Sequence, residues 1–156
     1  EKIALQFMVD PFKVSVKTGA TCQNVEQNII RASGKLNKLN TLKDLLSQPG
    51  FQKVLVFGRT KYGVEEISLS LLKDGYKAGS IHGDKRQSQR ENTLRQFKEG
   101  KINVLIATDV AARGIDVKDI SHVINFDQPG SYEDYIHRIG RTGRAGKTGI
   151  ALTFVD

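Results

Sequence analysis

The chain has 156 residues, of which 38% are hydrophobic and 26% are charged, so a disordered chain is excluded and one domain with its own core is expected. A formal net charge of +7 favours a polyanionic partner such as nucleic acid. The single cysteine, Cys22, excludes an internal disulfide and indicates a reducing, cytoplasmic compartment. The sequence contains no signal peptide and no apolar run near the ~20 residues of a membrane span, so no membrane partner is expected.

Residues 1–22 are predicted to be a linker or the tail of a preceding domain. They contain Asp10-Pro11, and a residue before proline is biased away from helical angles. The chain begins at Glu1 without a methionine and ends on the apolar run Ile150–Val155. We therefore expect a fragment of a longer protein, with one domain over residues 23–156.

Six short apolar runs follow and are predicted to be strands. Several lack polar alternation, as expected for strands buried on both faces. The runs are Asn28–Ala32, Val54–Phe57, Ser80–His82, Val104–Ala107, Val123–Phe126 and Ile150–Phe154. Apolar residues between the runs recur at helical spacing, in stripes of Leu36, Leu39, Leu42 and Leu46; Val64, Ile67 and Leu71; Leu94 and Phe97; and Tyr132, Ile136 and Ile139. This alternation predicts an α/β fold: a doubly wound, mostly parallel sheet with helices on both faces.

Ligands of such folds sit at the carboxyl ends of the strands, so the residues after each run are candidates. Gly58-Arg59-Thr60 follows the second run, and Gly83-Asp84 follows the third. We expect Asp84 to cap a helix that continues to about Lys98. Gln87 and Arg90 share a face of that helix near its N-terminus, which suits a phosphate. A capped surface helix with an incidental arginine is the alternative.

Two later segments concentrate polar side chains. Thr108 to Asp116 gathers a hydroxyl, two carboxylates, an arginine and a glycine after the fourth run; solvated charges on a turn are the alternative. His137 to Gly146 holds three arginines and three glycines in ten residues. Arginine offers a rigid donor fork for phosphate oxygens, and glycine lets the backbone approach closely. A basic turn that only adds solubility is the alternative.

Two other site types are not supported by the sequence. Gly146-Lys147-Thr148 resembles the end of a phosphate-binding P-loop, but that pattern requires a glycine where Arg141 stands. The expected context is also inverted, with a helix before the loop and a strand after it. No metal site is predicted, because the three histidines are far apart in sequence and a single cysteine does not complete a metal-binding motif with them. The histidines are His82, His122 and His137.

At these residues the chain resembles the C-terminal RecA-like domain of the DEAD-box ATP-dependent RNA helicases. The resemblance covers about Val25 to Asp156 and rests on four segments in the family's order: VLVFGRT at Val54–Thr60, QSQR at Gln87–Arg90, IATDVAARGID at Ile106–Asp116 and HRIGRTGR at His137–Arg144. Residues Glu1–Val16 are similar to the segment that leaves the family's first domain.

The resemblance implies a site for ATP, with Mg²⁺ held by a missing N-terminal domain. Arg141 and Arg144 would be arginine fingers that reach the γ-phosphate. Asp116 would contact the ribose, with Gly114 making room. The partner domain would be an N-terminal RecA-like domain of the same chain, docked with the help of His137 and Arg138.

The resemblance also implies that RNA is held by its backbone, with little sequence specificity. The residues that would hold it are Thr60, Gly83, Gln87, Arg90 and Thr108. The complete protein would unwind or remodel RNA duplexes, and the fragment alone would be inactive because it has no P-loop. Asp109, unlike Asp116, would mainly hold its loop by hydrogen bonds within the domain, with its carboxylate capping buried N–H groups.

Two other functions stay open at this point. One is an RNA-binding or protein-docking module with no nucleotide role, which would not need Arg141 and Arg144. The other is a DNA-translocating relative. Against it, the sequences HRIGRTGR and ATDVAARGID are typical of the RNA-specific family.

Overall fold

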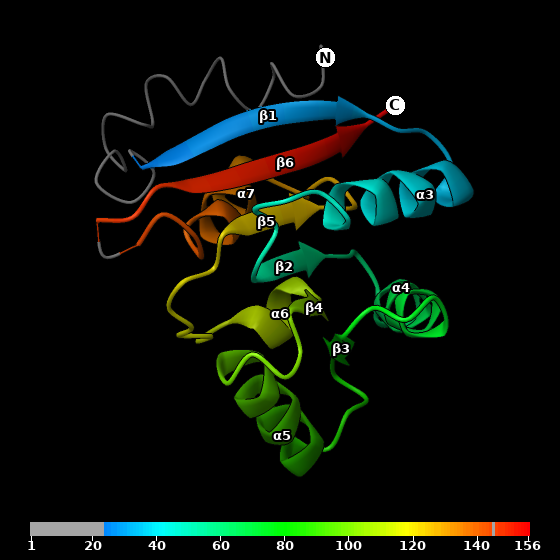
Figure 1. Ribbon diagram of the computed structural model, residues 1–156, viewed down its shortest axis with the longest axis vertical. Coiled ribbons are helices and arrows are strands. Elements are labelled where there is room, and N and C mark those ends of the chain that lie inside the picture. Colours follow the sequence, from blue (N-terminus) through cyan, green and yellow to red (C-terminus); the bar gives the residue numbers. More distant parts are fainter. Residues whose placement is uncertain (1–23, 145) are drawn as a thin grey trace.

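A six-stranded sheet forms the centre of the computed structural model, which describes residues 24–144 and 146–156. The strands are β1 (Val25–Arg31), β2 (Val54–Phe57), β3 (Ala78–Ile81), β4 (Val104–Ala107), β5 (His122–Asn125) and β6 (Gly149–Val155). They lie in the order β1-β6-β5-β2-β4-β3, and every pair is parallel. The predicted α/β fold is confirmed (Figure 1). The segment predicted to be a linker, residues 1–22, lies outside the described residues.

The helices are α3 (Lys35–Leu46), α4 (Lys61–Lys73), α5 (Gln87–Lys98), α6 (Asp109–Ala112) and α7 (Tyr132–Ile139). The four predicted stripes fall on α3, α4, α5 and α7. The single turn α6 was not predicted, since its four residues are too few for a periodic pattern. Thr108 caps it by accepting a hydrogen bond from the N–H of Ala111 at 3.3 Å.

Strand side chains alternate between two cores, one on each face of the sheet. Val54 and Val56 pack into a cluster with Leu42 of α3 and with Val64, Ile67 and Leu71 of α4. Leu55 and Phe57 point to the opposite face, where they pack into a cluster with Phe97 of α5 and with Ala111 and Ala112 of α6. A third cluster joins α7 to β1 and β6 through Val25, Tyr135, Ile136, Ile139 and Ala151. Helices α3 and α4 therefore cover one face, and α5, α6 and α7 the other, as Figure 1 shows.

Several boundaries differ from the sequence-based expectation. Strand β3 begins two residues earlier and ends one earlier than its apolar run, β5 lies one residue earlier, and β6 is one residue longer at each end. Strand β1 begins at Val25, earlier than the apolar run, because as an edge strand it pairs only with β6 and tolerates polar residues such as Glu26. Asp84 does not cap α5, so that prediction was wrong. The chain turns first, with the N–H of Lys85 donating to His82 O at 3.1 Å. The helix starts two residues later, after Arg86, whose N–H donates to Gln89 Oε1 at 3.0 Å.

Because all strands run the same way, their carboxyl ends meet at one edge of the sheet. The segments that follow β2, β3, β4 and β5 therefore come together there, although they are far apart in sequence. Among the described residues, no helix is long and apolar enough to cross a lipid bilayer.

Candidate functional site

A buried arginine joins α7 to the carboxyl edge of the sheet. The side chain of Arg138 is 2% exposed and contacts Asp109 through two hydrogen bonds, from Nε at 2.6 Å and from Nη2 at 2.8 Å. Its Nη1 donates to Asp127 O at 2.7 Å and to Asn125 Oδ1 at 3.3 Å, and its guanidinium lies 5.1 Å from the centre of the Phe57 ring. A buried charge needs such partners. Arg138 thus fixes α7 against α6 and the strand ends.

This contact bears on two predictions. Asp109 holds its loop by hydrogen bonds within the domain, as predicted, but its partner is the Arg138 guanidinium and not a set of capped N–H groups. The docking role of Arg138 stays a prediction, and the side chain itself lies in the interior of this domain. Neighbouring His137 is exposed and faces the cleft described next.

A cleft of about 300 Å³ opens beside this buried pair. It is lined by Phe57, Asp109, Ala112, Arg113, Gly114, Asp134, His137, Arg138 and Arg141. Gly114 has φ +78°, a left-handed conformation that favours glycine, and none of the described atoms lies within 4 Å of where its Cβ would be. The backbone angle therefore explains the glycine here.

The two predicted finger residues follow α7 and lie beside the predicted ribose carboxylate. Arg141 Nη1 donates to Ile115 O at 2.8 Å, while its Nε is buried and has no hydrogen-bond partner among the described residues. Burial and the charge of Arg144 lower the pKa of Arg141, and Asp116 partly opposes that shift. Arg144 Nη1 lies 3.3 Å from Asp116 Oδ1, and these side chains are 44% and 76% exposed. Two cations and one carboxylate are therefore gathered in one place.

Close backbone packing holds the loop that carries these arginines. Thr142 Oγ1 donates to Ile120 O. Gly143 has φ +69°, and a Cβ there would lie 2.9 Å from Asn24 O. A Cβ at Gly149, the first residue of β6, would lie 2.5 Å from Gly143 N. No sequence signal marks Gly149, since only the fold brings it against the loop.

The five residues predicted to hold RNA all follow β2, β3 or β4 and lie at the carboxyl edge. Thr60 caps α4 by accepting from the N–H of Gly63 at 3.0 Å, and its hydroxyl hydrogen remains available as a donor. Gly83 is exposed in the turn after β3, and Gln87 and Arg90 lie in the first turn of α5. Thr108 caps α6 directly before Asp109, which lines the cleft.

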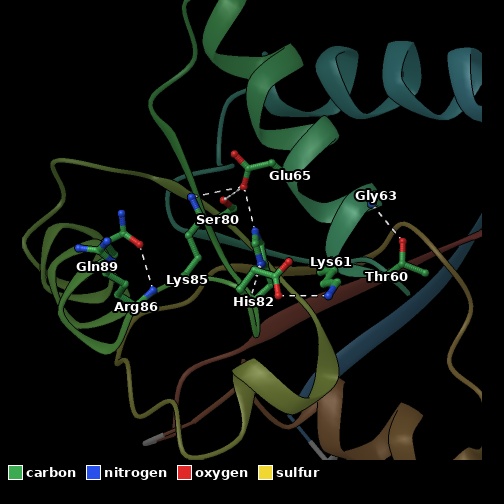
Figure 2. A network of polar contacts seen from close by, with 10 residues as sticks. Thr60, Lys61, Gly63, Glu65, Ser80, His82, Lys85, Arg86 and Gln89 are labelled. Carbon is green, nitrogen blue, oxygen red and sulfur yellow. Dashed lines mark hydrogen bonds and ion pairs between the residues drawn. The ribbon is translucent and has the colours of Figure 1, made fainter.

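Behind the turn after β3 lies a polar network that was not predicted from the sequence. Figure 2 shows Glu65 of α4 directed toward Ser80, His82 and Lys85. No sequence signal marks Glu65, because its partners lie on β3 and the β3–α5 turn, 15 to 20 residues away. Among the described residues, no group of three or more His, Cys, Asp or Glu side chains could hold a metal ion.

Comparison with known proteins gives concordant results. The family model for the helicase conserved C-terminal domain matches residues 37–146. The DEAD-box ATP-dependent RNA helicase CshA of Bacillus subtilis is 49% identical over 156 residues, covering 99% of this chain and 31% of that protein. CshA of Geobacillus kaustophilus is 49% identical over 155 residues, covering 99% of this chain and 33% of that protein. The chain thus spans about a third of the length of these relatives.

Two solved structures are similar in fold. The E. coli DEAD-box protein SrmB, bound to regulator of ribonuclease activity A, superposes with a TM-score of 0.80 at 43% identity, covering 84% of this chain and 77% of that one. Dbp5 of S. cerevisiae, bound to RNA and ADP BeF3, gives a TM-score of 0.77 at 33% identity, covering 85% of this chain and 35% of that one.

Proposed function

The chain belongs to the helicase conserved C-terminal domain family, as the C-terminal domain of a DEAD-box RNA helicase, and from that premise we propose how it contributes to activity. In this proposal the complete protein is an ATP-dependent RNA helicase with RNA-stimulated ATP hydrolysis. This domain supplies arginine fingers to ATP held by an N-terminal RecA-like domain and grips the RNA backbone. That N-terminal domain also holds Mg²⁺.

The observation that carries the proposal is the convergence of Arg141, Arg144 and Asp116. The residues fit a nucleotide: Arg141 Nε is buried without a described partner, and the exposed Arg144–Asp116 pair can open at little cost. When bound, ATP supplies the phosphoryl group that is transferred to water. Phosphoryl transfer depends on charge stabilisation, to which an arginine finger contributes a ~10³–10⁵ rate factor. Asp116 is the acceptor for a ribose hydroxyl.

Separation of the fingers from the triphosphate site explains control of hydrolysis. The sequence contains no P-loop, so the N-terminal domain binds the triphosphate, and Arg141 and Arg144 reach it only when the domains close. His137 is exposed at the cleft and is the proposed contact with that domain. Arg138 would contribute indirectly by fixing the orientation of α7 through its contact with Asp109.

The RNA grip is proposed on the carboxyl edge of the sheet. Its donors are two threonine hydroxyls, the exposed backbone at Gly83 and the side chains of Gln87 and Arg90, all suited to phosphate and sugar oxygens. Such contacts carry little sequence information. The structural relative Dbp5 has been solved with RNA, which supports the class of ligand. RNA bound across both domains would favour closure, so ATP and RNA binding are thermodynamically linked.

Finger substitutions in the full-length protein test the proposal. Arg141→Ala or Arg144→Ala should cut RNA-stimulated ATP hydrolysis by ~10² or more, because the finger charge acts mainly in the transition state. RNA binding without nucleotide should change little. Arg95→Ala is the matched control: that arginine lies in the last turn of α5 and bonds to Asn92. Normal turnover in both finger variants would favour the binding-module alternative.

A further inference from the structure

Glu65 of α4 connects three elements through a single carboxylate oxygen. Its Oε1 accepts a hydrogen bond from Ser80 Oγ at 2.8 Å. The same oxygen lies 3.0 Å from His82 Nε2 and 3.3 Å from Lys85 Nζ (Figure 2). Ser80 belongs to β3, His82 follows it, and Lys85 lies just before α5. One oxygen atom therefore joins α4 to β3 and to the β3–α5 turn.

The hydrogen bonds of His82 define its tautomer. The backbone N–H of Asp84 can only donate, and it points at His82 Nδ1 over 3.3 Å. Nδ1 is therefore the acceptor, so Nε2 carries the hydrogen and donates it to Glu65. The His82 side chain is 8% exposed. The buried imidazole thus links the backbone of the turn to a carboxylate on α4.

The network keeps Glu65 in its charged form. Burial opposes ionisation, but the hydrogen bonds from Ser80 and His82 and the charge of Lys85 outweigh burial and hold the pKa of Glu65 below its ordinary value. A carboxylate that is ionised at neutral pH accepts stronger hydrogen bonds than a neutral group. Glu65 therefore holds all three donors under ordinary conditions.

Polar contacts hold the turn at residues 83–86. Gly83 is exposed, and no described atom lies within 4 Å of where its Cβ would be. Asp84 is tied to Lys61 Nζ at 3.1 Å, and the N–H of Lys85 donates to His82 O at 3.1 Å. This turn carries Gly83 and leads directly into the first turn of α5. Groups that grip a ligand need support of this kind, because small displacements weaken several contacts at once.

We propose that Glu65 is a positioning residue for the RNA grip. Acting through His82 and Lys85, it holds the turn so that the proposed phosphate contacts keep one geometry; these contacts are Gly83, Gln87 and Arg90. The inference rests on the proposed RNA function of this edge and adds a residue that does not touch RNA itself. The Glu65 side chain is 36% exposed, so its loss opens no cavity in the apolar core.

The test uses full-length protein, single-stranded RNA and a non-hydrolysable ATP analogue, with affinity measured by fluorescence anisotropy. Glu65→Ala should weaken RNA binding by about 10-fold, since it removes the acceptor of two hydrogen bonds and the partner of the Lys85 ion pair. Glu65→Gln should retain most of the affinity, because its amide oxygen still accepts from Ser80 and His82. The next residue is the matched control: Glu66 pairs with Lys35 of α3, and Glu66→Ala should leave affinity unchanged.

Coupling to Arg90 separates positioning from a general loss of structure. In the double variant with Arg90→Ala, the effect of Glu65→Ala should be less than additive, although Glu65 has no direct contact with Arg90 in the structure. ATP turnover at saturating RNA should stay unchanged, while the RNA concentration for half-maximal turnover rises. Additive losses, or equal effects of Glu65→Ala and Glu66→Ala, would overturn the inference. If Arg90→Ala alone left affinity unchanged, the proposed RNA grip would fail; if it weakened binding and Glu65→Ala did not, only the positioning role would fail.

Discussion

Removing the Asp109 carboxylate would leave the buried Arg138 guanidinium with only neutral acceptors, Asn125 Oδ1 and Asp127 O. Asp109→Ala should therefore lower the free energy of unfolding of the domain by about 3 kcal/mol, the lower end for a broken buried pair. Asp116→Ala should change it by less than about 0.5 kcal/mol, because its pair with Arg144 is exposed. Urea denaturation of both variants measures the difference. The opposite ranking would mean that the two carboxylates have exchanged roles.

The Asp109–Arg138 pair shows which properties of a single residue can be predicted from the sequence. Spacing and residue type marked both Asp109 and Arg138 as site candidates, and the structure brings them into direct contact. Nothing in the sequence shows that the arginine turns inward, because its partner lies 29 residues away on another element. Arg141, Arg144 and Asp116 were placed together only through the family resemblance.

At the scale of elements, a histidine at the start of β5 makes the stability of the domain depend on pH. His122 is buried and its ring stacks on Phe51, with ring centres 3.7 Å apart. Burial lowers the pKa of His122 below its ordinary 6.5, so the unfolded chain binds its proton first as pH falls. The contribution of His122 to stability is thus present above about pH 6.5 and is lost as pH falls below that value.

His122→Phe keeps an aromatic ring against Phe51 and removes the titrating group. Between pH 7 and pH 5 the unmodified domain should lose more stability than the variant, when both are measured by urea denaturation in the same buffers. The other two histidines, His82 and His137, are present in both proteins and cancel in the difference. An equal loss in the two proteins would contradict the role assigned to His122.

Elements were predictable where hydrophobic pattern and burial coincide. β2 and β4 are buried on both faces, so their uninterrupted apolar runs marked their bounds correctly. The edge strand β1 is half exposed and has polar residues at its second to fourth positions, and α6 is a single turn, so neither boundary carries a periodic signal. Contacts between elements, such as Glu65 with His82 or Gly149 with Gly143, depend on sheet order, which no local pattern encodes.

At the scale of the whole molecule, the domain contains half of the proposed catalytic arrangement. It has two candidate fingers and a candidate ribose acceptor, but its sequence contains no P-loop that could hold the triphosphate. Function in this proposal arises from closure, when groups on two domains surround one nucleotide. A net charge of +7 favours approach of RNA to this domain even before closure.

The chain of 156 residues should accordingly show no RNA-stimulated ATP turnover by itself. Addition of the separately produced N-terminal domain, at concentrations high enough for the two to associate with RNA, should restore part of the activity, because closure requires contact and not a covalent link. A coupled assay of phosphate release measures both states, and the same mixture with Arg141→Ala should stay at background. Hydrolysis by the chain alone that Arg141→Ala abolishes would show that this domain holds the triphosphate itself. The division of the ATP site between two domains would then be wrong, while the contacts of Arg138 and Glu65 within this domain would stand.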